Sequence, residues 1–333
     1  MSARRELTPQ MQDYEAKFTD AGEIRWLPYL MYFHPTEHRS AAVNTDASGF
    51  RYSEAHGRRY SVADLGQSGP VRLLAGSSTV FGIGASADAW TLSSRMTEHD
   101  PRPQPWLNIG GRSFNSTQEL LLFTLYRHLL PEVEEIVLFS GFNNLGLARL
   151  PESVRGEHGA FFLCNQFFDA LRPRSTQQKP VRPRLRRGKD QPPAAEPVPS
   201  MPDQIAYAAE LTLRHLDIWR ALAADLGAKL TFVLQPLSGW VREVGSPQEE
   251  LLFAELDQLG SFSEVYGDIL QQEVCRGYAE AIEAGAKKMD VGFLNLSPVL
   301  ADRISPDQWV FVDRIHFTDQ GHDFVARELL ERL

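Results

Sequence analysis

An aspartate and a histidine stand three residues apart in the stretch DRIHFTDQGH, residues 313–322. A carboxylate that orients an imidazole can activate a hydroxyl nucleophile, so Asp313 and His316 are candidates for part of a hydrolytic site. A surface loop can hold the same two residues by chance, so the interpretation depends on a nucleophile elsewhere. Ser78 is the candidate, because it lies in GSSTVFG at 76–82, directly after an apolar run. At such a turn from strand to helix, backbone N–H groups favour a developing oxyanion.

Two more turns of the same kind carry groups that stabilise negative charge. The segment NIGGRSFNS at 108–116 offers backbone N–H groups and small side chains, and SGFNN at 140–144 presents the side-chain amide of Asn143. Taken alone, each is an ordinary loop, since asparagine is common in turns and helix caps. They are candidates for an active site because they lie at the ends of predicted strands.

The elements that would position these residues alternate along the chain. Continuous apolar runs without alternation are typical of strands buried on both faces, as in parallel sheets. Helical patterns lie between the runs, and Asn115 or Ser116, with Glu119 as partner, predicts a capping box. The alternation predicts a three-layer α/β/α sandwich with a mostly parallel, five-stranded sheet, whose ligand crevice lies at the carboxyl ends of the strands. The predicted strands are 71–76, 105–111, 135–141, 228–235 and 291–297, and the predicted helices are 116–130, 205–227 and a long stretch around 248–289.

Two segments do not follow this alternation. Residues 1–70 are rich in turns and aromatic residues, and we interpret them as an extension that wraps a domain at 71–333. Residues 172–200 are rich in proline and arginine and nearly lack large apolar side chains, which predicts a flexible insertion. Its basic part, 172–189, is either solvated or a docking site for an acidic partner.

Composition excludes several classes of function. Of 333 residues, 43% are hydrophobic and 23% are charged, as in a globular protein, and the net charge of −9 argues against nucleic-acid binding. No apolar run is long enough to span a membrane and no signal peptide is evident, so we expect a cytoplasmic protein. The two cysteines have no zinc-site spacing. HPTEH at 34–38 matches a zinc-peptidase pattern, but Pro35 after His34 opposes the helix that such a site requires. We therefore expect neither a metal nor a cofactor.

Together, the four motifs resemble the blocks of the SGNH (GDSL-type) hydrolase superfamily. The resemblance covers roughly residues 70–333 and rests on four short segments in the expected order. They are Gly76-Ser77-Ser78, Asn108-Ile109-Gly110, Gly141-Phe142-Asn143-Asn144 and Asp313-Arg314-Ile315-His316.

The resemblance implies a flavodoxin-like SGNH hydrolase fold and an esterase that acts on a small acyl or acetyl ester. Ser78 would be the nucleophile, His316 its base and Asp313 the residue that orients the base. The oxyanion would be held by the N–H of Ser78, the side chain of Asn143 and a backbone N–H of the second block. For that last donor we place Gly110 first and Ser113 as its competitor, because the family's later glycine is replaced here by Ser113.

The chain departs from the family pattern at two positions, Ser77 and Asn144, where aspartates are usual. A less negative site would suit an anionic substrate or change the pH at which His316 works. Asn144 and Trp240 are candidates for substrate contact, although Trp240 could equally pack a loop. Two other functions stay open: an acyltransferase that uses the same three catalytic residues, and a binding protein that has kept the fold without hydrolysis.

Overall fold

The computed structural model describes residues 2–18, 24–65, 69–155, 162, 197–260 and 262–333. The predicted insertion at 172–200 lies outside the described residues except for 197–200, and its basic part at 172–189 lies wholly outside them.

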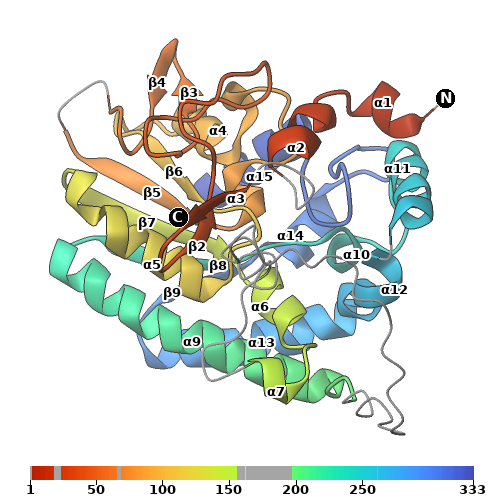
Figure 1. Cartoon of the computed structure of the whole chain (residues 1–333). Helices are drawn as coiled ribbons and strands as arrows, with labels where there is room; N and C mark the ends of the chain where they lie inside the picture. Colours follow the sequence, from red (N-terminus) through yellow and green to blue (C-terminus); the bar gives the residue numbers. More distant parts are fainter. Residues whose placement is uncertain (1, 19–23, 66–68, 156–161, 163–196, 261) are drawn as a thin grey trace, which may run out of the picture.

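A single five-stranded sheet forms the centre of the molecule (Figure 1). All neighbouring strands are parallel, in the order β6-β5-β7-β8-β9. In chain order this is 2-1-3-4-5, the flavodoxin-like arrangement, in which ligands bind where the strand order reverses. The predicted fold class is therefore confirmed. The strands are β5 (Val71–Gly76), β6 (Trp106–Gly110), β7 (Val133–Ser140), β8 (Lys229–Leu234) and β9 (Gly292–Asn295).

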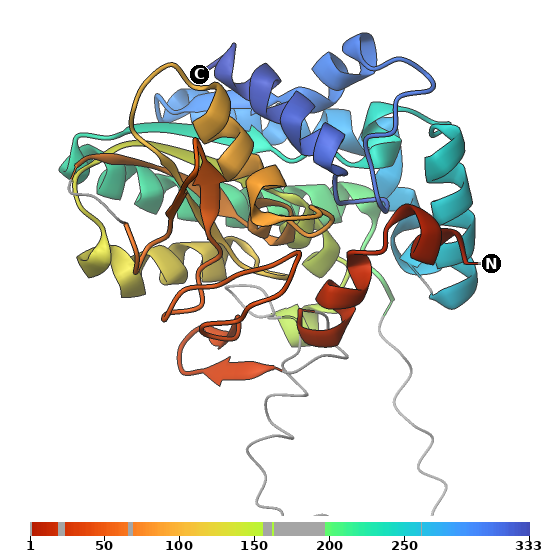
Figure 2. The ribbon, with the colours of Figure 1, turned by 90° about the horizontal axis from the view of Figure 1, so that it is seen from above.

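The apolar run of β5 is buried along its whole length because both faces of the sheet are covered. Leu73 and Ala75 belong to one core cluster, whereas Leu74 belongs to a second cluster on the opposite face. The first cluster includes side chains of α5 (Ser116–Tyr126), α9 (Met201–Leu226) and α13 (Gln272–Lys288). The second includes those of α4 (Leu92–His99), α14 (Leu296–Arg303) and α15 (Asp319–Leu330). Figure 2 shows helices on both sides of the sheet.

Helix α5 is capped by Asn115, but the partner in its capping box is Gln118 and not the predicted Glu119. Glu119 turns inward instead, and its Oε1 accepts a hydrogen bond of 2.7 Å from the Ser140 hydroxyl. A one-turn 3₁₀ helix, η2 (Arg127–Leu129), continues α5.

The stretch around 248–289, predicted as one helical region, is broken into several elements. They are α11 (Pro247–Leu259), α12 (Phe262–Tyr266), the 3₁₀ helix η4 (Gly267–Leu270) and α13. Gly260 ends α11 in an extended conformation, at φ −148° and ψ 173°. Gln271, also extended, separates η4 from α13. The apolar periodicity did not reveal these breaks because every piece packs one apolar face inward.

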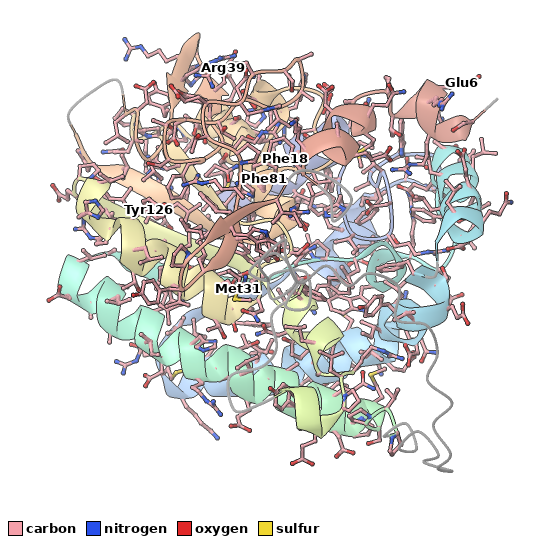
Figure 3. All side chains as sticks on the ribbon, viewed as in Figure 1. Glu6, Phe18, Met31, Arg39, Phe81 and Tyr126 are labelled. Carbon is pink, nitrogen blue, oxygen red and sulfur yellow. The ribbon has the colours of Figure 1, made fainter. Side chains whose placement is uncertain are left out.

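The described residues before β5 form small elements beside the turn that follows β5. These are the helices α1 (Ala3–Leu7) and α2 (Met11–Lys17), and the antiparallel pairs β1 (Arg25–Leu27) with β2 (Met31–Phe33) and β3 (Ser53–Ala55) with β4 (Arg58–Tyr60). Phe18, directly after α2, packs against Phe81 with 5.2 Å between ring centroids (Figure 3). The division into an extension at 1–70 and a domain at 71–333 stays a prediction. None of the helices in the described ranges is long and apolar enough to cross a membrane.

Candidate active site

Ser78 begins the short helix α3 (Ser78–Phe81), immediately after β5. The turn requires a glycine before it, since a Cβ on Gly76 would lie 2.2 Å from the Phe139 carbonyl oxygen and 2.6 Å from Val80 Cγ2. Gly82, with φ +94°, ends the helix in the left-handed region that favours glycine. Ser78 is thus held on a tight strand-to-helix turn at the carboxyl edge of the sheet.

Asp313, His316 and Ser78 form a continuous chain of hydrogen bonds. His316 Nε2 lies 2.8 Å from Ser78 Oγ, and His316 Nδ1 lies 2.7 Å from Asp313 Oδ2. The second carboxylate oxygen of Asp313 accepts the backbone N–H groups of Ile315 and His316, each at 2.8 Å. The structure therefore brings Ser78 into contact with His316, 238 positions later in the sequence.

The environment of Asp313 keeps its side chain charged. Burial acts to raise the pKa of Asp313, but the charge and hydrogen bond of His316 and the two backbone N–H groups outweigh it and lower that pKa. An ionised carboxylate accepts a hydrogen bond from Nδ1–H and so favours the imidazole tautomer whose Nε2 is an acceptor. In that tautomer, Nε2 can receive the proton of the Ser78 hydroxyl.

The loop of the second block favours Ser113 over Gly110 as an oxyanion donor. Gly110 lies inside β6, and its N–H donates to Asn108 Oδ1 at 3.0 Å. A Cβ at Gly110 would lie 2.1 Å from the backbone nitrogen of Phe81, so this glycine is needed for close packing under α3. The N–H of Gly110, which we placed first as donor, therefore already has an acceptor within the protein. Ser113 has φ +56°, and its N–H has no acceptor among the described residues.

Asn143 lies in the first turn of α6 (Phe142–Leu147), which follows β7. Its Nδ2 donates one hydrogen bond of 2.7 Å to the Phe114 carbonyl oxygen, in the loop that contains Ser113. An amide nitrogen carries two protons, so Nδ2 has a second proton beyond the one donated to Phe114. Gly141, with φ +124°, allows the sharp turn that places this side chain.

Two residues of the N-terminal segment hold the Ser113 loop, and the sequence interpretation did not identify either role. Tyr32 in β2 donates its hydroxyl proton to the Ser113 carbonyl oxygen at 3.2 Å. His34 Nε2 accepts the N–H of Arg112 at 3.1 Å, and its Nδ1 lies 3.2 Å from the Gly49 carbonyl oxygen. Burial first, and then the charge of Arg112, lower the pKa of His34 well below its usual value, so the ring stays neutral as these bonds require.

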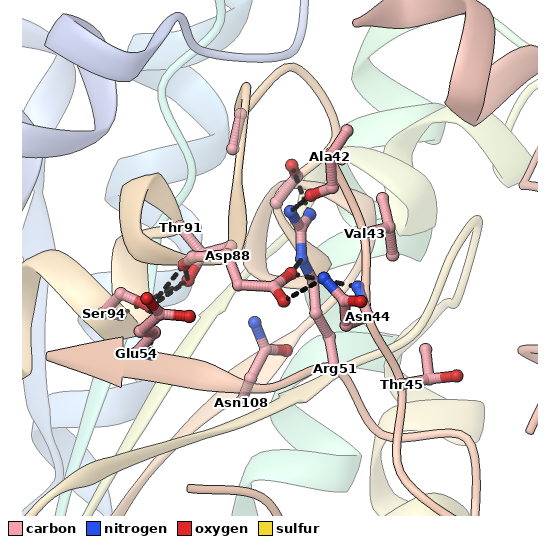
Figure 4. A network of polar contacts seen from close by, with 12 residues as sticks. Ala42, Val43, Asn44, Thr45, Arg51, Glu54, Asp88, Thr91, Ser94 and Asn108 are labelled. Atoms are coloured by element: carbon pink, nitrogen blue, oxygen red, sulfur yellow. Dashed lines mark hydrogen bonds and ion pairs between the residues drawn. The ribbon is translucent and has the colours of Figure 1, made fainter. Parts of the chain in front are cut away.

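A buried ion pair fixes the other end of α3 (Figure 4). The Arg51 guanidinium donates to the carbonyl oxygens of Phe81 and Gly82 at 3.1 and 2.8 Å. Its Nε lies 2.9 Å from Asp88 Oδ1, and Asp88 also accepts the side-chain amide of Asn44 at 2.8 Å. Through Arg51, the N-terminal segment is therefore hydrogen-bonded directly to the end of the helix that begins at Ser78.

The two residues predicted to contact substrate, Asn144 and Trp240, lie in the protein interior. Asn144 is buried, and its amide donates to Ser116 Oγ and Thr212 Oγ1, each at 2.8 Å. Trp240, 3% exposed, donates its indole N–H to the Ile269 carbonyl oxygen at 2.7 Å. Burial and these internal hydrogen bonds argue against the predicted contact of Asn144 and Trp240 with substrate. Asn144 can accept and donate at once, which suits a buried network better than a carboxylate would.

The pattern HPTEH does not form a zinc site. His34 uses both ring nitrogens for backbone groups, and residues 34–38 form no helix. In the part of the chain that the structure describes, no group of three or more His, Cys, Asp or Glu side chains is arranged to hold a metal ion.

Comparison with known proteins gave weak likenesses of structure only. No family model matches the chain, and no curated protein matches it. Among 34 matching chains of known structure is a lipase/acylhydrolase from Enterococcus faecalis, 10% identical, with a TM-score of 0.45 over 79% of this chain and 94% of that one. A member of the lipolytic G-D-S-L family from Veillonella parvula is 12% identical, with a TM-score of 0.42 over 80% and 100% of the two chains.

The aryl esterase of M. smegmatis is a further match, at 12% identity and a TM-score of 0.43 over 79% of this chain and 98% of that one. At these values, the roles of Ser78, His316 and Asp313 must be argued from their own contacts and not from these proteins.

Proposed function

We propose that the protein is a serine ester hydrolase that cleaves a small acyl ester through an acyl-enzyme on Ser78. The observation that carries this proposal is the chain of hydrogen bonds from Asp313 through His316 to the Ser78 hydroxyl, at 2.7 and 2.8 Å. A hydroxyl is a weak nucleophile without a base in contact with it, and here the base is itself oriented by a carboxylate.

In the proposed mechanism, Ser78 Oγ attacks the ester carbonyl carbon while His316 Nε2 takes the hydroxyl proton. The carbonyl oxygen becomes an oxyanion held by the N–H groups of Ser78 and Ser113 and by the amide of Asn143. The bond to the alcohol oxygen then breaks, and His316 returns its proton to that oxygen. Water, deprotonated by His316 in the same way, hydrolyses the acyl-serine and restores the free enzyme.

The test is hydrolysis of a p-nitrophenyl acyl series, from acetate to octanoate, by the wild type and by Ser78→Ala and Ser77→Ala. The neighbouring Ser77 is the matched control, because it is buried on the same turn, whereas the hydroxyl in contact with His316 Nε2 is that of Ser78. We expect Ser78→Ala to lose at least 10³-fold in kcat and Ser77→Ala to retain activity. Equal turnover by Ser78→Ala and wild type would refute the proposal. Covalent labelling of Ser78 by a fluorophosphonate probe, without turnover of any ester, would instead indicate transfer of the acyl group to an acceptor other than water.

A further inference from the structure

A cavity of about 420 Å³ opens beside the proposed catalytic histidine. Its apolar wall consists of Leu256 and Leu259 of α11, Phe262 of α12 and Ile315, and His316 lies at its edge. Phe262 also packs against Phe142, the neighbour of Asn143, with 6.3 Å between ring centroids. A cavity of this size suits the apolar part of a small molecule.

The charged groups around this cavity are already paired, so they do not call for an ionic ligand. Arg314 Nη2 lies 2.6 Å from Asp257 Oδ2, and its guanidinium lies over the Phe253 ring at 4.8 Å. Arg4, the other cation at the cavity, forms an ion pair with Glu15. A hydrocarbon group would therefore gain more from this cavity than a charged group would.

The position of the cavity relative to His316 distinguishes the two halves of an ester. The acyl carbonyl must lie against the oxyanion donors, whereas the departing alcohol oxygen must lie within reach of the proton on His316 Nε2. The cavity is lined by Asp313, Ile315 and His316, and by none of Ser78, Ser113 and Asn143 within the described ranges. It is thus on the histidine side of the site.

Building on the proposed function, we infer that this cavity holds the alcohol part of the substrate, and that the alcohol carries an uncharged alkyl or aryl group. The alcohol leaves when its C–O bond to the tetrahedral carbon breaks and the proton passes from His316 Nε2 to its oxygen. The neutral alcohol then departs through the apolar cavity, and the acyl group stays on Ser78.

The inference is tested with two ester series in which only one half of the substrate grows. Ethyl, butyl, hexyl and octyl acetate lengthen the alcohol at nearly constant leaving-group chemistry, and the methyl esters of the matching acids lengthen the acyl group. We expect kcat/KM to rise with alcohol length by about fourfold per methylene until the cavity is filled. We expect no comparable rise along the acyl series.

Three variants test whether the rise of kcat/KM with alcohol length arises in this cavity. Leu259→Asp places a charge in the cavity, and Leu251→Asp places the same charge elsewhere on α11; both leucines are exposed, at 68% and 59%. Gly260→Phe fills the cavity from a position where, among the described residues, an added Cβ would have only the Leu256 carbonyl oxygen within 4 Å, at 3.8 Å. Leu259→Asp and Gly260→Phe should reduce the preference for hexyl over ethyl acetate at least tenfold, whereas Leu251→Asp should leave it unchanged.

A flat alcohol series, or an equal effect of Leu251→Asp and Leu259→Asp, would overturn the inference. So would an effect of the cavity variants on the acyl series alone, since the cavity would then hold the acyl group. These results leave hydrolysis by Ser78 intact. Failure of the wild type on every ester would instead remove the proposed function, and this inference with it.

Discussion

Asn143 and Asp313 each form hydrogen bonds to the backbone. These bonds fix the direction in which the remaining amide proton of Asn143 and the remaining carboxylate oxygen of Asp313 point. Asn143 donates one amide proton to Phe114, and Asp313 accepts two backbone N–H groups with one oxygen while the other faces His316. Side chains anchored in this way lose little rotational freedom when a substrate binds, as preorganised catalytic groups should.

At this scale we predict that Asn143→Ala lowers kcat by about 10²–10³ and changes KM little, because the amide stabilises charge that develops only in the transition state. The measurement is steady-state hydrolysis of p-nitrophenyl acetate, with thermal unfolding to show that the variant is folded. A loss that falls wholly on KM, or a loss below threefold, would exclude Asn143 from the oxyanion site.

Glu119 is a buried carboxyl group that the proposed mechanism does not use. Burial raises its pKa to about 8, while its hydrogen bond from Ser140 acts in the opposite direction. An unfolded glutamate is ionised at pH 7, so folding requires proton uptake, and this lowers stability at every pH above the ordinary pKa. Glu119→Gln keeps the acceptor for Ser140 without that cost.

We therefore predict that Glu119→Gln raises the free energy of unfolding at pH 7 by roughly 2–3 kcal/mol. The gain should disappear near pH 4, where the carboxyl is protonated in both the folded and unfolded states. Urea denaturation at the two pH values measures both quantities. A variant that is less stable than the wild type at pH 7 would contradict this prediction.

At the scale of elements, β2 supports the loop that carries the Ser113 N–H. Tyr32 and His34 bind the peptide groups on either side of the Arg112–Ser113 peptide, which contains this proposed oxyanion donor. Ser113 is in the left-handed region, which a non-glycine residue occupies at some cost, so the loop depends on contacts that hold it there.

Tyr32→Phe removes the hydroxyl that donates to Ser113 and keeps the ring. We predict a five- to tenfold loss in kcat at unchanged KM, the value of one net hydrogen bond that orients the donor. Tyr29→Phe is the matched control, since Tyr29 belongs to the same hairpin but is 82% exposed. Equal activities for the two variants would contradict a positioning role for Tyr32.

The sequence predicted the elements better than the contacts between them. All five strands and the groups at their carboxyl ends were predictable, because burial on both faces and glycine at close approaches leave a clear local pattern. Tyr32 and His34 were not, since their role exists only once β2 lies against a loop some eighty residues later. The burial of Asn144 and Trp240 was not predictable for the same reason: sequence alone places a side chain near a strand end but does not show which side it faces.

At the scale of the whole molecule, packing has buried titratable groups around the site. His322 in α15 packs edge-on against Phe317, with 5.5 Å between ring centroids. Burial first, and then the charges of Arg51 and His316, lower the pKa of His322 to about 3. In the unfolded chain the pKa of His322 is higher. Below about pH 6.5 the unfolded chain therefore binds a proton at His322 that the folded protein does not bind, and the free energy of unfolding falls as the pH falls.

We predict that the free energy of unfolding falls by about 2 kcal/mol between pH 7 and pH 5 through His322 alone. His322→Leu should be less sensitive to pH by this amount, whereas His56→Leu, at an exposed position, should behave as the wild type does. Urea denaturation at pH 7, 6 and 5 gives the slopes. Equal slopes for all three proteins would show that His322 does not contribute.

Covalent labelling with a fluorophosphonate probe, followed by mass spectrometry of the labelled peptide, tests directly whether Ser78 is the nucleophile. We predict one phosphonylated residue, Ser78, and at least a hundredfold slower labelling in His316→Ala, because the base is needed to activate the hydroxyl. A label on Ser77 or elsewhere, no label at all, or an unchanged rate in His316→Ala would contradict it.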